Sequence, residues 1–314
     1  MPPARDGRML IANLKAVGEL WNMQLNPAKG TTSGEPQLIT GDETAKQYPS
    51  ISRDGSRLAY EAGNTRPPVR IEIRLRDMAD GRESALMVRG PALGLQPKPS
   101  VDGSVLAYRE FLEGKWRSFL VAGKAASGKP ICEDCIIRSL FSNPEEAIVQ
   151  YQNELVRQNL STGSRLSILK AADGHVLDAD LSPDDRWVVF VLGKPSGANA
   201  LYVVPVGQSP VSHKEWIQVA DEDFLLDSPR WSADGNLLYF VSERDGRPCI
   251  WAQPMHPQTR KPTGSALEIY HEKRARYAAA GPKRWQAISV ARDKLIALRC
   301  NATGNIWLAN LETK

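Results

Sequence analysis

The sequence has few of the residues on which hydrolase, nucleotide and metal sites depend. It contains four histidines and four cysteines among 314 residues, and no two histidines stand at the i, i+2 or i, i+4 spacing that suits a shared metal ion. No Gly-x-Ser-x-Gly segment and no glycine-rich phosphate loop is present. These absences argue against a serine hydrolase, an intrinsic kinase or NTPase, and a histidine-based metal site, so we expect no metal and no cofactor.

Long apolar runs are also missing. The longest are strand-length, far below the roughly 18 residues that cross a bilayer, and the first residues lack the apolar core of a secretory signal. The net charge of +4 is too small to indicate nucleic acid or an anionic membrane as a partner. Glycine and proline are abundant, at 24 and 22 residues, which favours many turns, short strands and a single all-β domain.

A short polar turn followed by aliphatic and aromatic residues recurs seven times. The clearest copy is Ser52-Arg53-Asp54-Gly55, which precedes Leu58-Ala59-Tyr60. The other copies contain Asp6-Gly7, Asp102-Gly103, Ser142–Glu145, Asp184-Asp185, Asp234-Gly235 and Arg292–Lys294. Their spacing of about 40 to 59 residues is the period of a four-stranded propeller blade, not of a helical repeat.

Each repeat contains several strand signals of period 2 separated by turns, which is typical of an antiparallel meander. A single blade cannot bury both faces of its sheet, so successive blades must stack around an axis. The sequence therefore predicts an all-β propeller of four-stranded antiparallel blades, with seven blades favoured, six allowed, and closure complete or incomplete. The expected units of this single domain, residues 1–314, are about 4–40, 47–88, 96–131, 138–169, 178–219, 227–270 and 285–311.

The aspartates of the repeated turns are expected to be structural. Glycine accepts positive φ without steric cost, and the Asp carboxylate can accept hydrogen bonds from the backbone that follows it, which fixes the hairpin. A ring of catalytic or metal-binding carboxylates is the less favoured interpretation, because the same residue recurs in the same turn.

Three segments resemble the blade pattern of the TolB-like β-propeller family: Ser228–Phe240, Cys249–Gln253 and the terminal Thr303–Leu308. The resemblance covers nearly all the chain and weakens between Ile136 and Leu169. It implies a non-catalytic, monomeric module that binds a protein or peptide, as the C-terminal part of a larger bacterial regulatory or envelope protein. Family analogy implies the periplasm, although a cytoplasmic location is open because the sequence shows no signal peptide. The alternative is a propeller enzyme or enzyme-capping domain, associated with lyase or peptidase activity, whose site lies in the axial channel.

Loops that precede the first strand of each blade are expected to place side chains around the channel mouth. The candidates are Gln47, Tyr48, Gln96, Asp178, Asp227, Arg230 and Arg284. Their mixed polarity suits recognition of a peptide or protein, and several could simply solvate a water-filled channel. For the enzyme alternative, Asp178 with Asp180 or Asp227 is the available acid-base pair.

A basic segment interleaved with aromatic residues lies in the longest insertion of the chain. Its cations are Lys273, Arg274, Arg276 and Lys283. The pattern suits an acidic peptide or a nucleic-acid backbone. A solvated loop is the favoured interpretation, because Glu268 and Glu272 lie close by and the overall charge is small.

The motif Cys132-Glu133-Asp134-Cys135 is the one local pattern of reactive residues. A structural zinc site would lack two ligands, and a thioredoxin-type motif requires a helix that this all-β sequence does not supply. We expect a loop between two blades, closed by a disulfide if the environment is oxidising.

Both ends of the repeat pattern are incomplete. The first unit offers strands two to four and the last offers strands one to three, which do not add up to one sealed blade. Because a closed propeller avoids exposed edges, we expect either the C-terminal piece of a longer polypeptide or an unusual closure that leaves an edge open.

Overall fold

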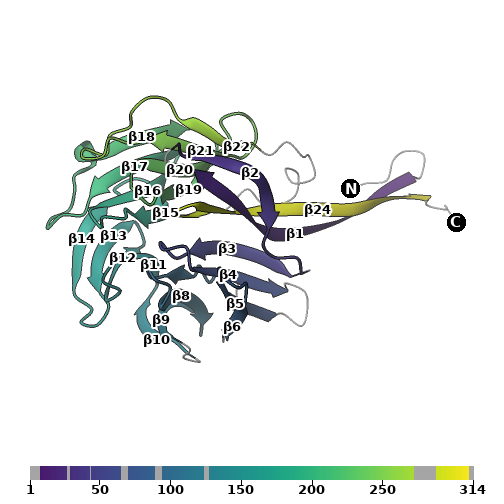
Figure 1. Cartoon of the computed structure of the whole chain (residues 1–314), viewed down its shortest axis with the longest axis horizontal. Helices are drawn as coiled ribbons and strands as arrows, with labels where there is room; N and C mark the ends of the chain where they lie inside the picture. The colour runs from purple at the N-terminus through teal and green to yellow at the C-terminus, as the bar shows by residue number, and fades with distance from the viewer. Residues whose placement is uncertain are drawn as a thin grey trace.

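The computed structural model describes residues 8–26, 29–42, 44–64, 70–88, 94–123, 127–271 and 288–310. These residues form six four-stranded antiparallel sheets, arranged as the blades of a propeller (Figure 1). This confirms the predicted fold class, with the smaller of the two blade numbers that the sequence allowed. The part of the chain so described contains one short 3-10 turn, His213–Glu215, and no helix long and apolar enough to cross a membrane.

Five blades each consist of four strands that are consecutive in the chain. The first two blades are β3 (Ala45–Ile51), β4 (Arg57–Asn64), β5 (Arg70–Asp77) and β6 (Glu83–Met87), then β7 (Lys98–Pro99), β8 (Val105–Leu112), β9 (Lys115–Ala122) and β10 (Lys129–Glu133). The next is β11 (Cys135–Leu140), β12 (Glu146–Tyr151), β13 (Glu154–Asn159) and β14 (Arg165–Lys170). The last two are β15 (His175–Leu181), β16 (Trp187–Gly193), β17 (Asn199–Pro205) and β18 (Ile217–Glu222), then β19 (Leu226–Trp231), β20 (Leu237–Ser242), β21 (Cys249–Pro254) and β22 (Leu267–His271).

The two ends of the chain share the remaining blade, whose strand order is β2-β1-β24-β23. Its strands are β1 (Arg8–Asn26), β2 (Thr31–Leu38), β23 (Ile288–Ala291) and β24 (Lys294–Asn310). The sequence suggested three strands from each end. Instead, the second and third expected strands of each terminal unit run together as one long strand, so six expected strands become four. The expectation that these units would not complete one blade is therefore wrong.

Strands β1 and β24 pair along their whole length, from Arg8 opposite Asn310 to Gln24 opposite Lys294. The outer strands pair only with the inner part of this strand pair: β2 starts pairing at Trp21, and β23 pairs with β24 as far as Ala297. Beyond these points β1 and β24 continue as a two-stranded ribbon that projects from the propeller (Figure 1). The side chains of Trp307 and Leu308 on this ribbon are 61% and 60% exposed.

The hydrophobic core lies between neighbouring sheets. One cluster joins Phe190 and Tyr202 of one blade to Phe141 and Ile148 of the blade before it. Within this cluster Phe190 stacks on Tyr202 and meets Trp216 edge-on, with ring centroids 5.7 and 5.0 Å apart. Since apolar burial is the main favourable term in folding, each blade depends on its neighbour for stability.

The repeated turns have the hydrogen bonds expected of structural aspartates. In the clearest copy Asp54 accepts from the hydroxyl of Ser52 at 2.6 Å and from the backbone N–H of Ser56 at 2.9 Å, while Gly55 has φ of 77°. The copies at Asp102, Asp184 and Asp234 have the equivalent pair of bonds. These carboxylates therefore hold hairpins, as the sequence suggested.

Candidate functional site

The innermost strands of the blades carry irregularities at the end where each strand begins. The pairing register shifts at Gln47/Ser50 in β3, Ile137/Ser139 in β11, Val176/Asp178 in β15 and Asp227/Arg230 in β19. In three blades the residue that precedes a proline at this end has positive φ: Tyr48 at 49°, Gln96 at 47° and Ser228 at 53°. A bulge re-aims a side chain, so these distortions help turn polar groups toward the axis.

Two rings of side chains follow from the repeat. Counting back from the serine of each turn, the residues four positions earlier are Tyr48, Gln96, Arg138, Asp178 and Ser228. The residues two positions earlier are Ser50, Lys98, Leu140, Asp180 and Arg230. The first ring lines a cavity of about 330 Å³, here called the mouth cavity, and the second lines a cavity of about 310 Å³ near the turns, here called the turn-side cavity.

Lys98 and Arg230 line both cavities and therefore form the boundary between them. Of the seven side chains predicted for the mouth, five line the mouth cavity: Tyr48, Gln96, Asp178, Asp227 and Arg230. Gln47 does not; it is 7% exposed, and its amide nitrogen has no hydrogen-bond partner within the described residues. Arg284 and the basic segment with Lys273, Arg274, Arg276 and Lys283 lie outside the described residues.

Sequence reasoning missed Lys98 and Arg138, which both line the mouth cavity. Each stands at a repeat position already represented among the predicted residues, Lys98 with Arg230 and Arg138 with Asp178. Alignment of the repeats on the turn serine would have found them.

Asp178 is the centre of a buried charge network. Its carboxylate lies 2.8 Å from Nη1 of Arg230 and 3.4 Å from Nη1 of Arg138, and the three side chains are 13%, 10% and 5% exposed. Burial alone would raise the pKa of Asp178, but the positive charges of Arg230, Lys98 and Arg138 outweigh burial and lower this pKa to about 2. Asp178 is therefore a fixed anion at physiological pH.

Both arginines have further partners. Arg138 donates from Nε to the Gln150 side chain at 2.8 Å and from Nη2 to the Leu177 carbonyl at 2.9 Å. Arg230 donates from Nη1 to the Pro229 carbonyl at 2.6 Å. Such partners fix the two guanidinium groups in place, so this part of the wall is organised before any ligand arrives.

Hydrogen bonds also fix the side chain of Asp180 in place. Its carboxylate accepts from the Ser139 hydroxyl at 3.0 Å and from the Trp231 backbone N–H at 3.2 Å. Within the residues that the structure describes, the ammonium group of Lys98 by contrast has no hydrogen bond and no ion pair. Burial lowers the pKa of Lys98 to about 8, and the charge of Arg230 adds to the effect.

Asp227 shows the opposite behaviour to Asp178. Burial raises its pKa to about 6, and the negative charge of Asp178 contributes in the same direction. One oxygen of Asp227 accepts from the Ser228 backbone N–H at 2.6 Å. The mouth cavity thus contains one carboxylate that is always ionised and one that titrates close to neutrality.

Comparisons with known proteins identify the fold. No protein-family model matches the chain. The Tol-Pal system protein TolB of Syntrophus aciditrophicus (strain SB) is 32% identical over 103 residues, which are 33% of this chain and 19% of that protein. The solved structure of a putative TolB from Agrobacterium tumefaciens has a TM-score of 0.67 at 14% identity and covers 91% of this chain and 99% of its own. TolB from Acinetobacter baumannii has a TM-score of 0.59 at 13% identity, with 91% of this chain and 66% of that chain covered. The fold is that of a TolB-like β-propeller.

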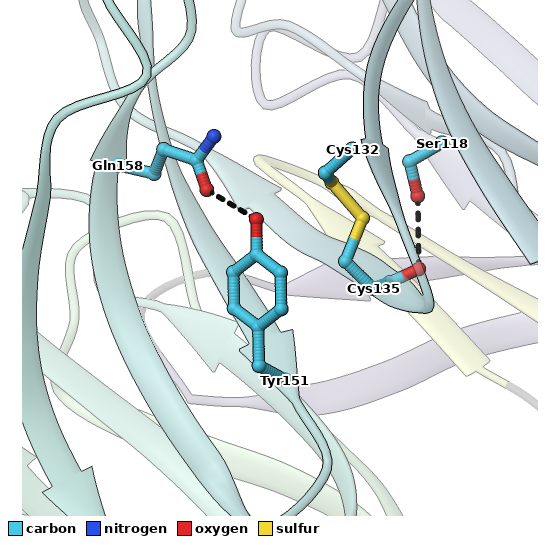
Figure 2. The surroundings of a disulfide bond; sticks show 5 residues. All are labelled: Ser118, Cys132, Cys135, Tyr151 and Gln158. Carbon is cyan, nitrogen blue, oxygen red and sulfur yellow. Dashed lines mark hydrogen bonds between the residues drawn. A yellow bond between two sulfur atoms is a disulfide. The ribbon is translucent and has the colours of Figure 1, made fainter.

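In this TolB-like propeller the Cys132-x-x-Cys135 motif joins two blades. Cys132 lies in β10, Cys135 begins β11, and the structure places a disulfide bond between them (Figure 2). The carbonyl of Cys135 accepts from the Ser118 hydroxyl at 3.0 Å. The described part of the TolB-like propeller contains no group of three His, Cys, Asp or Glu side chains that could hold a metal ion. The Cys-x-x-Cys pair is therefore built into the junction of two blades, away from the axial cavities.

Proposed function

We propose that this TolB-like propeller is a non-catalytic module that binds a protein or peptide at the mouth cavity. It acts as a monomer, as the C-terminal part of a larger bacterial regulatory or envelope protein. The observation that supports the proposal most directly is the convergence of polar side chains from several blades on one concave site. A cavity of about 330 Å³ lies at the small end of the range for ligand sites, so it suits a short segment or a few side chains of a partner.

The organisation of the mouth also favours binding. Asp178, Arg138 and Arg230 are held by one another and by backbone carbonyls. Polar groups that are fixed in advance lose little entropy when a ligand binds. The partly exposed Tyr48 and Gln96 add an aromatic face and an amide at the rim of the same cavity.

A pull-down with matched variants tests this proposal. The mouth variant is Tyr48→Ala/Gln96→Ala, which removes the 3.5 Å hydrogen bond from Arg138 to Gln96 but keeps the ion pairs of Asp178 with Arg138 and Arg230. The control variant is Glu145→Ala/Ser161→Ala, because both of these side chains are exposed and neither lines an axial cavity. We expect partners retained by the wild-type and control proteins to be lost by the mouth variant. Equal recovery by all three proteins would overturn the proposal.

One observation favours the enzyme alternative. Asp178 and Asp227 line the same cavity with pKa values of about 2 and about 6, and carboxylates with separated pKa values are typical of acid-base pairs. The ion pairs of Asp178 weigh against a catalytic role for it, because they occupy its oxygens. If wild-type protein turned over a saccharide or peptide and Asp227→Asn abolished the turnover, the enzyme alternative would replace the binding module.

A further inference from the structure

Within the described residues, one cation of the mouth cavity makes no hydrogen bond and no ion pair. Arg138, Arg230 and Lys98 all line the cavity, yet among the described residues only Lys98 lacks a hydrogen bond or ion pair. We propose that the ammonium group of Lys98 binds a carboxylate of the ligand, either the C-terminal carboxylate of a peptide or an acidic side chain. This inference rests on the proposed function, since it names the chemical group that the mouth recognises.

The position of Lys98 supports this role. It comes from β7, a strand of two residues, and lies at the boundary of the two cavities, where a group entering from the mouth would reach it. Removing an ammonium group from bulk water without a compensating partner is costly. A ligand that supplies an acceptor at this point would therefore gain an interaction that the free protein does not make for itself.

The surrounding charges favour a singly charged anion. Phosphate is best held by the planar fork of an arginine, but the guanidinium groups of Arg138 and Arg230 already contact Asp178 and backbone carbonyls. Asp178 and Asp227 also line the cavity and would repel a dianion more strongly than a monoanion. A single ammonium group beside several carboxylates thus suits a monoanionic ligand carboxylate better than a dianion.

The proposal predicts a pH dependence that involves every charged group around Lys98. The anions are Asp178 and Asp180 from β15 and Asp227 from β19, and the cations are Arg138 from β11 and Arg230 from β19. The carboxyl of Asp227 has a pKa of about 6, so a ligand carboxylate binds best below that pH, where Asp227 is neutral. Lys98, with a pKa of about 8, must be protonated to bind it. Affinity should therefore fall as the pH rises through 6 and again as it rises through 8, whereas burial raises the pKa of Tyr48 from its ordinary value, so Tyr48 does not contribute.

NMR of protein labelled with ¹³C-lysine provides the experiment. The Lys98 Cε resonance, assigned by its loss in Lys98→Met, is followed during titration with four probes: acetate, N-acetylglycylglycine, its C-terminal amide, and N-acetylglutamylglycinamide. We expect saturable shifts with the three carboxylates, a rise in the pKa of Lys98, and no shift with the neutral amide. Comparison of the two peptide acids shows whether a C-terminal or a side-chain carboxylate is preferred.

Variants add a second measurement. Lys98→Met should weaken binding of the preferred acid at least about tenfold, the loss expected for a charged hydrogen bond, while Lys115→Met, at an exposed residue paired with Glu133, should not change it. An unshifted Lys98 resonance with millimolar acetate and both peptide acids would overturn the inference. If the amide and the acids bound equally, the carboxylate contact would be wrong while peptide binding at the mouth stood. Because the pKa rise is measured in the wild-type protein, the result does not depend on how well Lys98→Met folds.

Discussion

Replacement of Arg230 by methionine tests whether the charge network at the mouth is balanced as the structure indicates. Arg230 lies 2.8 Å from Asp178, and both side chains are nearly buried. Methionine retains most of the apolar stem but removes the charge. Breaking a buried ion pair by removing one partner costs about 3–5 kcal/mol, because the other charge is left uncompensated. Arg138 remains 3.4 Å from Asp178, so we expect the lower end, about 3 kcal/mol at neutral pH.

The lowered pKa of Asp178 gives a second value for the folding free energy that this charge network contributes. A fall from 3.8 to about 2 corresponds to about 2.5 kcal/mol of folding free energy at neutral pH. Because this pKa is lowered in the folded state, the stabilisation is present above the unfolded pKa and is lost as the pH falls through about 2. Without Arg230 the pKa of Asp178 should rise, so its carboxyl would be neutral near pH 3 in the variant. The free energies of unfolding of the variant and the wild-type protein would therefore differ less at that pH.

The assay is urea-induced unfolding followed by tryptophan fluorescence at pH 7 and near pH 3. We expect Arg230→Met to be destabilised by about 3 kcal/mol at pH 7, by clearly less near pH 3, and to be partly rescued at pH 7 in the double variant Arg230→Met/Asp178→Asn. A matched control is Arg165→Met, because Arg165 stacks over Tyr151 at an exposed position without contacting Asp178. A loss below about 0.5 kcal/mol at pH 7, the usual range of a surface substitution, or an equal loss at both pH values, would refute the reasoning.

Three further predictions concern other parts of the molecule. Asp227→Asn should stabilise the protein by up to about 3 kcal/mol above pH 6, since the raised pKa of about 6 means that ionisation of Asp227 opposes folding. The gain in the free energy of unfolding, measured with urea, should vanish as the pH falls toward 4. Gly18→Ala should destabilise the protein by about 1–3 kcal/mol, because its Cβ would clash with the Lys46 carbonyl oxygen, whereas Gly41→Ala would meet no neighbour; equal thermal midpoints would contradict this. Thiol titration of the denatured protein without reductant should detect two of the four cysteines, and detection of all four would rule out the Cys132–Cys135 disulfide.

The sequence was sufficient for the blades because each carries its own turn and strand signals. The Asp-Gly turns mark hairpins locally, so strands such as β4 and β20 could be placed without knowledge of the partner blade. The positions around the mouth follow from the same repeat, since equivalent residues such as Tyr48 and Asp178 stand at a fixed distance before the serine of their turn.

The terminal blade could not be predicted in the same way. Local patterns locate the apolar runs at Met9–Ile11 and Leu20–Leu25, but they do not say whether the chain between them turns or continues. The answer depends on β24, nearly the whole chain away, which supplies backbone pairing through this segment. Lys98 was missed for a related reason: β7 has two residues and shows no strand period of its own, so only comparison between repeats reveals its place on the axis.

The distribution of unfavourable features around the axis argues that function lies at the mouth. Positive φ in a residue that is not glycine costs about 1–3 kcal/mol, and Tyr48, Gln96 and Ser228 share this conformation at equivalent positions of three blades. The ammonium group of Lys98, which makes no hydrogen bond or ion pair to any residue that the structure describes, and the raised pKa of Asp227 occur at the same end. At the opposite end the repeated turns have well-satisfied carboxylates, and in three of them positive φ falls on glycine, at Gly55, Gly103 and Gly235; Asp185 and Arg292 adopt it in two other turns. Since departures from local consistency tend to gather at functional sites, the contrast between the two ends favours ligand entry through the mouth cavity over entry from the turn side.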